Sequence, residues 1–112
     1  MRTFAARLAE RILGGSAPIV IGLDPRTDAL PRRLLPGAAP AARIVAFYRE
    51  ALPVLARHAP CVKPNIAFFE CFGADGYRAY EEVCAIARQH ELLVVGDVKR
   101  GDIGSTAEAY AE

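Results

Sequence analysis

The chain has 112 residues, of which 53% are hydrophobic and 24% charged, and this globular balance excludes a disordered tail. Fourteen basic residues against thirteen acidic ones give a net charge of +1, too little positive charge to favour binding to nucleic acid or an anionic membrane. No apolar run approaches the ~20 residues of a membrane-spanning helix, and the opening residues lack the apolar stretch of a signal peptide. We therefore expect a cytoplasmic protein that binds neither nucleic acid nor membrane.

The cysteines and histidines do not form the pattern of a disulfide framework or a metal site. Cys61, Cys71 and Cys84 are separated by ten and thirteen residues, an odd count without a close pair. His58 and His90 lie away from them in sequence and show no ligand spacing. We expect three reduced thiols packed among apolar neighbours, and no metal.

The first elements are a helix and a buried strand. Phe4, Leu8 and Ile12 recur every four positions, which predicts an amphipathic helix over Thr3–Leu13 that the following glycines end. The nearly continuous apolar run Pro18–Leu23 then predicts a strand buried on both faces, as in a parallel sheet.

Residues 25–40 hold four prolines and little periodicity, which predicts a long loop. A second helix is predicted from Ala41, with Pro53 expected to kink or break it. Beyond it, the pattern predicts, in chain order, a strand at Ala59–Lys63, a short helical turn within Ile66–Phe72, a helix with Asp75 as its N-cap that runs to about Gln89, a strand at Leu92–Gly96, and a helix from about Ser105 with a capping box to Glu108.

Helices and strands thus alternate, with room for right-handed crossovers between parallel strands, and the fold class is α/β. Three parallel strands leave two bare sheet edges, which folded proteins normally avoid. We therefore expect residues 1–112 to be the amino-terminal part of a larger domain, the first three βα units of a (β/α)8 TIM barrel.

An ionisable side chain follows each predicted strand. Asp24 follows the first strand, Lys63 ends the second, and Asp97, Lys99 and Asp102 follow the third. Sites in parallel α/β folds form at the carboxyl ends of the strands, so these groups should share one rim. Alternating carboxylates and ammoniums keep one another ionised and would bind a polar substrate rigidly.

Each of these residues also has a plain structural interpretation. Asp24 before Pro25 could start a turn, and Lys63 could be an exposed strand end. Asp102 could cap the next helix, and Asp97 with Lys99 could be a structural ion pair. His90 likewise suits the carboxyl end of a helix, where positive charge is favourable. The coincidence of charges at successive strand ends is what favours a functional site.

Residues 97–106, Asp-Val-Lys-Arg-Gly-Asp-Ile-Gly-Ser-Thr, closely resemble the signature of the orotidine 5'-phosphate decarboxylase family. Residues 21–25 and 62–65, with the Phe-Phe-Glu of residues 68–70, resemble the first and second strand ends of the same family. The resemblance is to the longer, bacterial-type branch and covers only the amino-terminal part of a family member. It implies a cofactor-free decarboxylase that makes UMP in pyrimidine biosynthesis.

The resemblance also implies roles for individual residues. Lys63, Asp97, Lys99 and Asp102 match a Lys-Asp-Lys-Asp array, in which Asp97 faces the substrate carboxylate and Lys99 supplies the proton to C6. Lys63 would hold Asp97 and a ribose hydroxyl. Three further residues match substrate-binding positions: Asp24, which binds a ribose hydroxyl, and Ile103 and Thr106 beside Asp102. Members of the family form homodimers, and the resemblance implies that Asp102 reaches into the active site of the neighbouring subunit.

Two alternatives remain open from the sequence. One is a phosphosugar decarboxylase or aldolase of the same suprafamily, which would use Asp24, a glutamate near the second strand and magnesium. The other is a non-catalytic half-barrel that binds a nucleotide or a partner chain. The phosphate-gripping and pyrimidine-closing segments of the family have no counterpart in these residues, so we expect the 112 residues alone to be weakly active or inactive.

Overall fold

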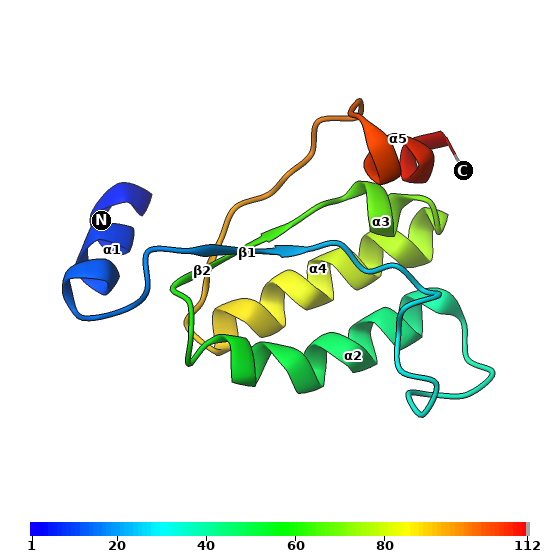
Figure 1. The fold of residues 1–112 in the computed structure, drawn as a ribbon, viewed down its shortest axis with the longest axis horizontal. Coiled ribbons are helices and arrows are strands. Elements are labelled where there is room, and N and C mark those ends of the chain that lie inside the picture. The colour runs from blue at the N-terminus through cyan, green and yellow to red at the C-terminus, as the bar shows by residue number, and fades with distance from the viewer. Residues whose placement is uncertain (112) are drawn as a thin grey trace.

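A computed structural model of the chain describes residues 1–111. It contains three parallel strands in the order β1-β2-β3 and five helices among the described residues (Figure 1). The elements, in chain order, are α1 (Phe4–Leu13), β1 (Val20–Leu23), α2 (Pro40–Leu55), β2 (Cys61–Pro64), α3 (Ala67–Glu70), α4 (Gly73–Gln89), β3 (Leu93–Val94) and α5 (Gly104–Ala111). The α/β class and the parallel sheet predicted from the sequence are confirmed.

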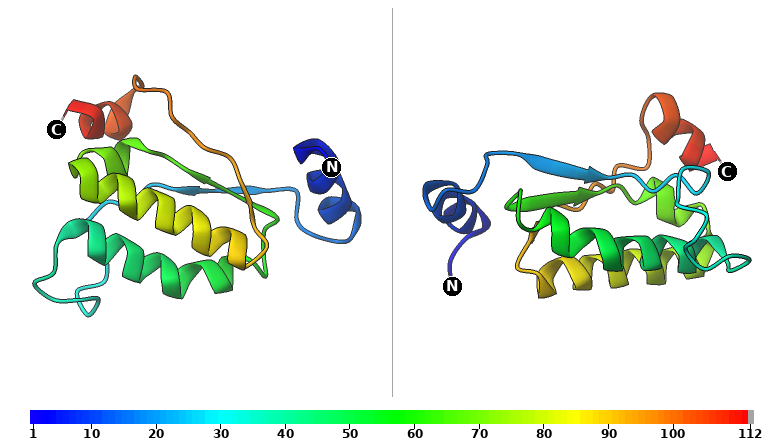
Figure 2. Two further views of the ribbon diagram at one scale, coloured as in Figure 1. Left: turned by 180° about the vertical axis from the view of Figure 1, so that it is seen from behind. Right: turned by 60° about the horizontal axis from the view of Figure 1, so that its bottom comes forward.

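The sheet and two long helices form two layers. Helices α2 and α4 lie side by side against one face of the sheet, and the opposite face carries no helix layer in the described residues (Figure 2). The core between the layers is fully apolar, with Leu23 and Val62 from the sheet packed against Ile44, Leu52 and Val83 from the helices. This arrangement exposes about 51% of Val20, so the prediction that β1 is buried on both faces is wrong for this structure.

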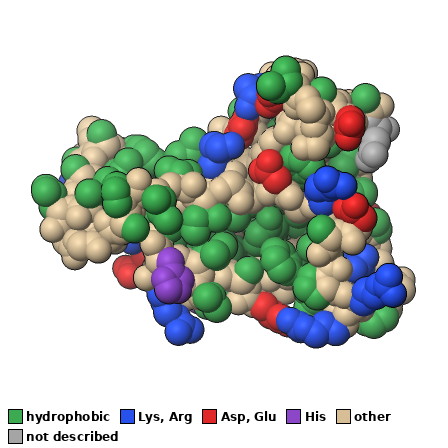
Figure 3. Space-filling view, viewed as in Figure 1, with side chains coloured by type: hydrophobic (Ala, Val, Ile, Leu, Met, Phe, Trp, Pro, Cys, Tyr) green, Lys and Arg blue, Asp and Glu red, His purple; other side chains and the backbone are tan. Residues whose placement is uncertain are grey.

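Helix α1 stands apart from this core, beyond the amino-terminal ends of the strands (Figure 1). The Thr3 side chain caps it by accepting a hydrogen bond from the backbone N–H of Ala6 at 3.2 Å. None of its residues is buried, so the apolar stripe that includes Phe4 and Ile12 reaches the surface. In the space-filling view, hydrophobic side chains come to the surface across the middle of the molecule, between groups of charged side chains (Figure 3).

Several element boundaries differ from the prediction. Helix α2 begins at Pro40 and continues through Pro53 to Leu55, because a proline in the last turn removes only one hydrogen-bond donor before the helix ends. Helix α4 begins at Gly73, so Asp75 lies in its first turn and pairs with Arg78 instead of serving as the N-cap.

The predicted strands are also longer than those observed. Strand β3 has two residues, and the pairing resumes beyond it as an isolated bridge between Asn65 and Asp97. Helix α5 starts at Gly104, which places Ser105 inside the helix and not at its N-cap.

A glycine fixes the close approach of α3 and α4. A Cβ atom on Gly76 would lie 1.7 Å from the backbone carbonyl oxygen of Phe69, a distance that no side chain can occupy. Helix α3, predicted as a short helical turn, therefore packs tightly on the start of α4 and is held at the carboxyl end of the sheet.

Candidate active site

Four charged side chains form a continuous series at the carboxyl end of the sheet. Lys63 Nζ lies 3.1 Å from Asp97 Oδ2, and Lys99 Nζ lies 2.5 Å from Asp97 Oδ1. The same Lys99 ammonium lies 3.1 Å from Asp102 Oδ2. The structure thus brings together Lys63, Asp97, Lys99 and Asp102, which we call the charge array.

The strand register explains why Lys63 and Asp97 meet. Lys63 stands opposite Gly22 of β1, and Asp97 stands opposite Asn65, two residues beyond Lys63. Because side chains alternate between the faces of a strand, Lys63 and Asp97 lie on the same face, the one without a helix layer. The array therefore lies on the open face, at the carboxyl end of the strands.

Asp97 is the centre of the array. Its side chain is only 10% exposed, whereas the Lys63 and Lys99 side chains are 40% and 50% exposed. The hydrogen bond from Lys99, with that from Lys63, holds the pKa of Asp97 below its ordinary value, although burial opposes this shift. Asp97 is therefore ionised at neutral pH.

The flanking members are held in their charged forms as well. Hydrogen bonds to Asp97 and then to Asp102 raise the pKa of Lys99 above that of an ordinary lysine. The backbone N–H of Ile103, which donates to Asp102 Oδ1 at 2.9 Å, and then Lys99 lower the pKa of Asp102. Two ammoniums and two carboxylates thus alternate with no net charge.

Asp24 lies near the array without joining it. It follows β1 on the face that Gly22 shares, since a Cβ on Gly22 would lie 3.7 Å from Asp24 Oδ1. Asp24 is exposed and forms no ion pair with the array within residues 1–111. A ligand bound over the open face could therefore reach the exposed Asp24 carboxylate at the same edge of the sheet.

The contacts differ among Asp102 and the two residues implied to lie beside it, Ile103 and Thr106. Asp102 pairs with Lys99 of its own chain, whereas the family resemblance implied contact with a neighbouring subunit's site. The Thr106 hydroxyl accepts a hydrogen bond from the Asn65 side-chain amide at 3.2 Å, which ties α5 to the end of β2. Ile103 is 85% exposed and contributes nothing to the core.

Sequence reasoning missed two parts of this region. Asn65 is the one polar residue buried in the described chain; its oxygen accepts the Ala67 N–H at 3.3 Å while its amide holds Thr106. Arg100, next to Lys99, turns to the opposite side and pairs with Glu70. The sequence held no comparable signal for Asn65 or Arg100. For the array it held a further one, because only two of the fourteen basic residues are lysines, and both belong to the array.

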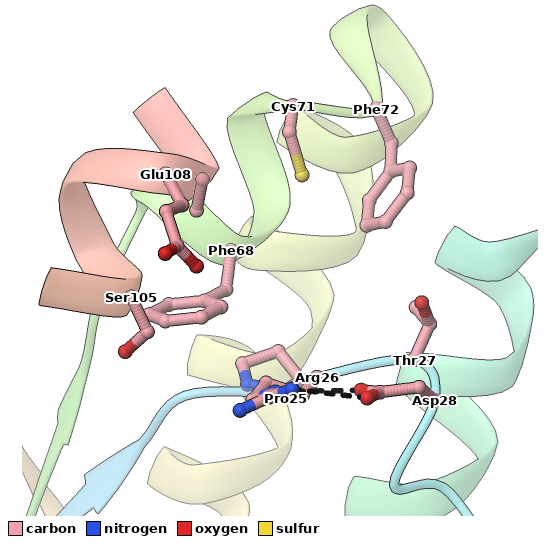
Figure 4. A pocket seen from close by; sticks show the side chains of 10 residues that line it. Pro25, Arg26, Thr27, Asp28, Phe68, Cys71, Phe72, Ser105 and Glu108 are labelled. Atoms are coloured by element: carbon pink, nitrogen blue, oxygen red, sulfur yellow. Dashed lines mark hydrogen bonds and ion pairs between the residues drawn. The ribbon is translucent and has the colours of Figure 1, made fainter. Parts of the chain in front are cut away.

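A separate cavity of about 290 Å³ lies between the β1–α2 loop, α3 and α5 (Figure 4). Phe68 and Phe72 form its apolar part, and Ser105 and Glu108 of α5 border it. Arg26 and Asp28 pair across the loop side, with Nη2 and Oδ2 at 3.0 Å. None of the array residues lines this cavity.

Residues 1–111 contain neither a cluster of metal ligands nor a membrane-spanning helix. No three of the His, Cys, Asp and Glu side chains in this range come together as metal ligands. None of the helices described is both long and apolar enough to cross a membrane.

The sequence matches the family model described as "Orotidine 5'-phosphate decarboxylase / HUMPS family" over residues 17–112. It is 45% identical to an orotidine 5'-phosphate decarboxylase of Deinococcus radiodurans, with 98% of this chain and 38% of the relative aligned. It is 42% identical to the one of Rhodopirellula baltica, over 100% of this chain and 39% of the relative.

A solved structure shows the same likeness. The crystal structure of a putative orotidine 5'-phosphate decarboxylase from Streptomyces avermitilis superposes with a TM-score of 0.72 at 40% identity, covering 99% of this chain and 38% of that one. The chain thus spans about two fifths of the length of the relatives it matches. Its three βα units correspond to the amino-terminal part of a TIM-barrel protein, as the sequence predicted.

Proposed function

The chain belongs to the orotidine 5'-phosphate decarboxylase / HUMPS family, and on that premise we propose that its protein converts orotidine 5'-phosphate to UMP in pyrimidine biosynthesis. The observation that carries this proposal is the position of Asp97, a shielded carboxylate between two ammoniums at 3.1 and 2.5 Å. Such a centre offers a fixed negative charge and a proton donor side by side, the two groups that a decarboxylation without a cofactor requires.

In the proposed reaction, the substrate carboxylate lies against Asp97. The bond between C6 and the carboxylate carbon breaks, carbon dioxide leaves, and the electron pair stays on C6. Lys99 stabilises this carbanion and then transfers a proton from Nζ to C6, becoming a neutral amine that water reprotonates. Asp97 and Asp102 favour the ammonium form of Lys99, so the donor is charged before the bond breaks.

The remaining roles concern binding. Lys63 would hold Asp97 and a ribose hydroxyl, and the exposed Asp24 carboxylate would accept a hydrogen bond from a second ribose hydroxyl. Ile103 and Thr106 would contact the substrate from the start of α5. We propose that residues 1–112 act as the amino-terminal part of a TIM-barrel decarboxylase domain that pairs into a homodimer with shared sites.

The alternative of a magnesium-dependent phosphosugar enzyme is less well supported. That chemistry needs a carboxylate near the second strand where a cation can reach it. Here β2 presents Lys63, whose ammonium already lies 3.1 Å from Asp97, and Glu70 beyond it is paired with Arg100. The array supplies positive charge from its own side chains in the place where the alternative needs a metal ion.

A Lys99→Ala variant tests the assignment. In the longest form of the protein that decarboxylates orotidine 5'-phosphate, we expect this variant to lose at least about a thousandfold in kcat, because it removes the proton donor and a transition-state charge together. Release of carbon dioxide from carboxyl-labelled substrate measures the rate. Arg33→Ala, which removes an exposed ion pair with Glu50, is the control and should retain the parent rate.

Calorimetric titration with UMP separates catalysis from binding. If Lys99→Ala still binds UMP but does not release carbon dioxide, the catalytic role stands. Turnover within tenfold of the parent would show that Lys99 is not the donor. UMP binding by a parent protein without turnover would favour the non-catalytic alternative.

Complementation tests the shared site. Asp102 pairs with its own Lys99 in the single chain, so a role in a neighbouring site requires the 97–104 segment to turn outward when two chains associate. Mixing inactive Lys99→Ala protein with inactive Asp102→Ala protein should restore some activity, because a heterodimer then holds one site with both native residues. Full inactivity of subunits shown to exchange would place Asp102 in its own chain's site.

A further inference from the structure

Arg100 adopts a backbone conformation that arginine rarely takes. Its φ is +72°, in the left-handed region that favours glycine and asparagine. A non-glycine residue is strained in this conformation, so the surrounding contacts must hold it. Arg100 stands between Lys99 and Asp102, which both belong to the charge array.

The contacts of Arg100 reach three helices. Its Nε lies 2.7 Å from Glu70 Oε2 of α3, and its Nη2 donates to the Tyr77 hydroxyl of α4 at 2.6 Å. Its backbone N–H donates to the Tyr110 hydroxyl of α5 at 2.9 Å. Its Nη1 donates to the Val98 carbonyl at 2.9 Å, so the side chain also folds back on its own loop.

The partners of Arg100 are tied to one another. The Tyr77 hydroxyl donates to Glu70 Oε1 at 2.8 Å, so Arg100, Glu70 and Tyr77 close a ring of polar contacts. Glu70 Oε2 is shielded from water, which strengthens its attraction to Arg100 relative to a surface ion pair. Since Gly76 locks α3 against α4, Glu70 and Tyr77 form a rigid base for this ring.

The direction of Arg100 matters for its neighbour. The Lys99 side chain contacts Asp97 and Asp102, while the Arg100 side chain contacts α3 and α4, so the two consecutive side chains have separate sets of partners. A loop that is fixed at Arg100 therefore presents Lys99 to the array in one orientation. If Arg100 were released, the chain at residues 98–102 would be free to return to an ordinary negative φ and carry Lys99 away from Asp97.

We propose that Arg100 is a positioning residue, held by Glu70, Tyr77 and Tyr110, that sets the Lys99 ammonium between Asp97 and Asp102. The catalytic part of this inference rests on the proposed function, whereas the geometric part does not. The Arg100 guanidinium is engaged by Glu70 and Tyr77, and the proposed role needs no contact with substrate. Its effect should appear in the orientation of Lys99 and in kcat more than in KM.

The test uses the two lysines of the chain as reporters. In protein made with lysine labelled by ¹³C at Cε, the signals that disappear in Lys63→Arg and in Lys99→Arg assign these two residues. In Arg100→Gln, loss of a nearby positive charge alone would raise the pKa of Lys99. Loss of positioning would lower it, because Lys99 would leave the two carboxylates that raise its pKa. We expect the pKa to fall.

Two further variants separate this effect from charge and from folding. Tyr77→Phe removes one hydroxyl and no charge, and it too should lower the pKa of Lys99. Arg33→Gln, the same change at the exposed pair with Glu50, should leave it unchanged. A Lys99 pKa that rises or stays the same in Arg100→Gln, together with no change in Tyr77→Phe, would overturn the proposal.

Kinetics give the second readout. In the active protein, Arg100→Gln should lower kcat about tenfold with KM changed less than threefold, because a displaced donor slows proton transfer and leaves ground-state binding intact. If the parent does not decarboxylate orotidine 5'-phosphate, the proposed function fails, and the Lys99 titration still decides whether Arg100 positions it. An unchanged kcat in a variant with a lowered Lys99 pKa would overturn the catalytic part alone.

Discussion

The two faces of the sheet contain similar residues and have different environments. On the face covered by α2 and α4, Leu23 and Val62 have almost no exposed surface. On the opposite face, Val20 is half exposed, and the same strands end in Lys63 and Asp97. The comparison shows that an apolar strand sequence does not reveal which face a protein packs and which face it uses for chemistry.

The difference follows from what each face must do. The covered face needs shape complementarity, because its free energy comes from excluding water between close-packed side chains. The open face needs charges at fixed separations, and the strand register supplies these on the side that α2 and α4 do not cover. One face therefore governs stability, and we expect the other to govern activity.

The largest effect on stability should come from the covered side. Phe69 has no exposed surface and packs edge-to-face on Tyr80 with ring centroids 5.4 Å apart. Phe69→Ala should lower the free energy of unfolding by about 3–5 kcal/mol, since it removes an aromatic ring and leaves a cavity. Urea unfolding followed by circular dichroism measures the change.

The matched control lies on the open face. Val20→Thr replaces a methyl group by a hydroxyl at a half-exposed strand position, and it should change the free energy of unfolding by less than about 0.5 kcal/mol. A loss comparable to that of Phe69→Ala would mean that the open face is covered in solution, and the contrast between the faces would then fail.

A smaller, pH-dependent effect should come from the array. The folded pKa of Asp97 lies below its ordinary value of 3.8, so its ion pairs stabilise the fold above about pH 4. That contribution is lost as the pH falls through the folded pKa. Asp97→Asn should therefore be less stable than the parent near pH 7, and the two should converge under strongly acidic conditions. Urea midpoints between pH 2 and pH 7 measure the convergence, and a constant difference across this range would contradict it.

At alkaline pH, the contribution of Lys99 to the free energy of unfolding falls as the pH rises. The folded pKa of Lys99 lies above its ordinary value of 10.5, so its contribution is present below that pH and is lost as the pH rises through the folded pKa. Between these limits, the array should leave stability nearly independent of pH.

Much of the fold was predictable because periodicity reports local structure. The apolar repeat of α1, the continuous apolar run of β1 and the strand-end charges all depend on residues close in sequence. The bounds of β3 and the start of α4 were not predictable in the same way, because strand length follows from pairing and α4 begins where Gly76 meets the backbone of Phe69.

The array itself was predictable, but its support was not. Lys63 lies in β2, and Asp97, Lys99 and Asp102 follow β3, so the topology brings all four to one edge of the sheet. The ring around Arg100 joins Glu70 of α3 and Tyr77 of α4 to a loop much later in the chain, through a left-handed backbone that no local pattern indicates. Tertiary contacts of this kind leave no periodic signal.

The choice of lysine for both ammoniums has a consequence for chemical reactivity. Twelve of the fourteen basic residues are arginines, so the only side-chain primary amines are Lys63 and Lys99. Within residues 1–112, an acylating reagent would therefore modify the α-amino group and the array, and would leave the arginine side chains unchanged. Neutralising both lysines would shift the formal net charge from +1 to −1 and leave the Asp97 carboxylate without its two counter-charges. Residues 1–112 thus carry their acylation-sensitive side chains in one place, where a single class of electrophile can reach them.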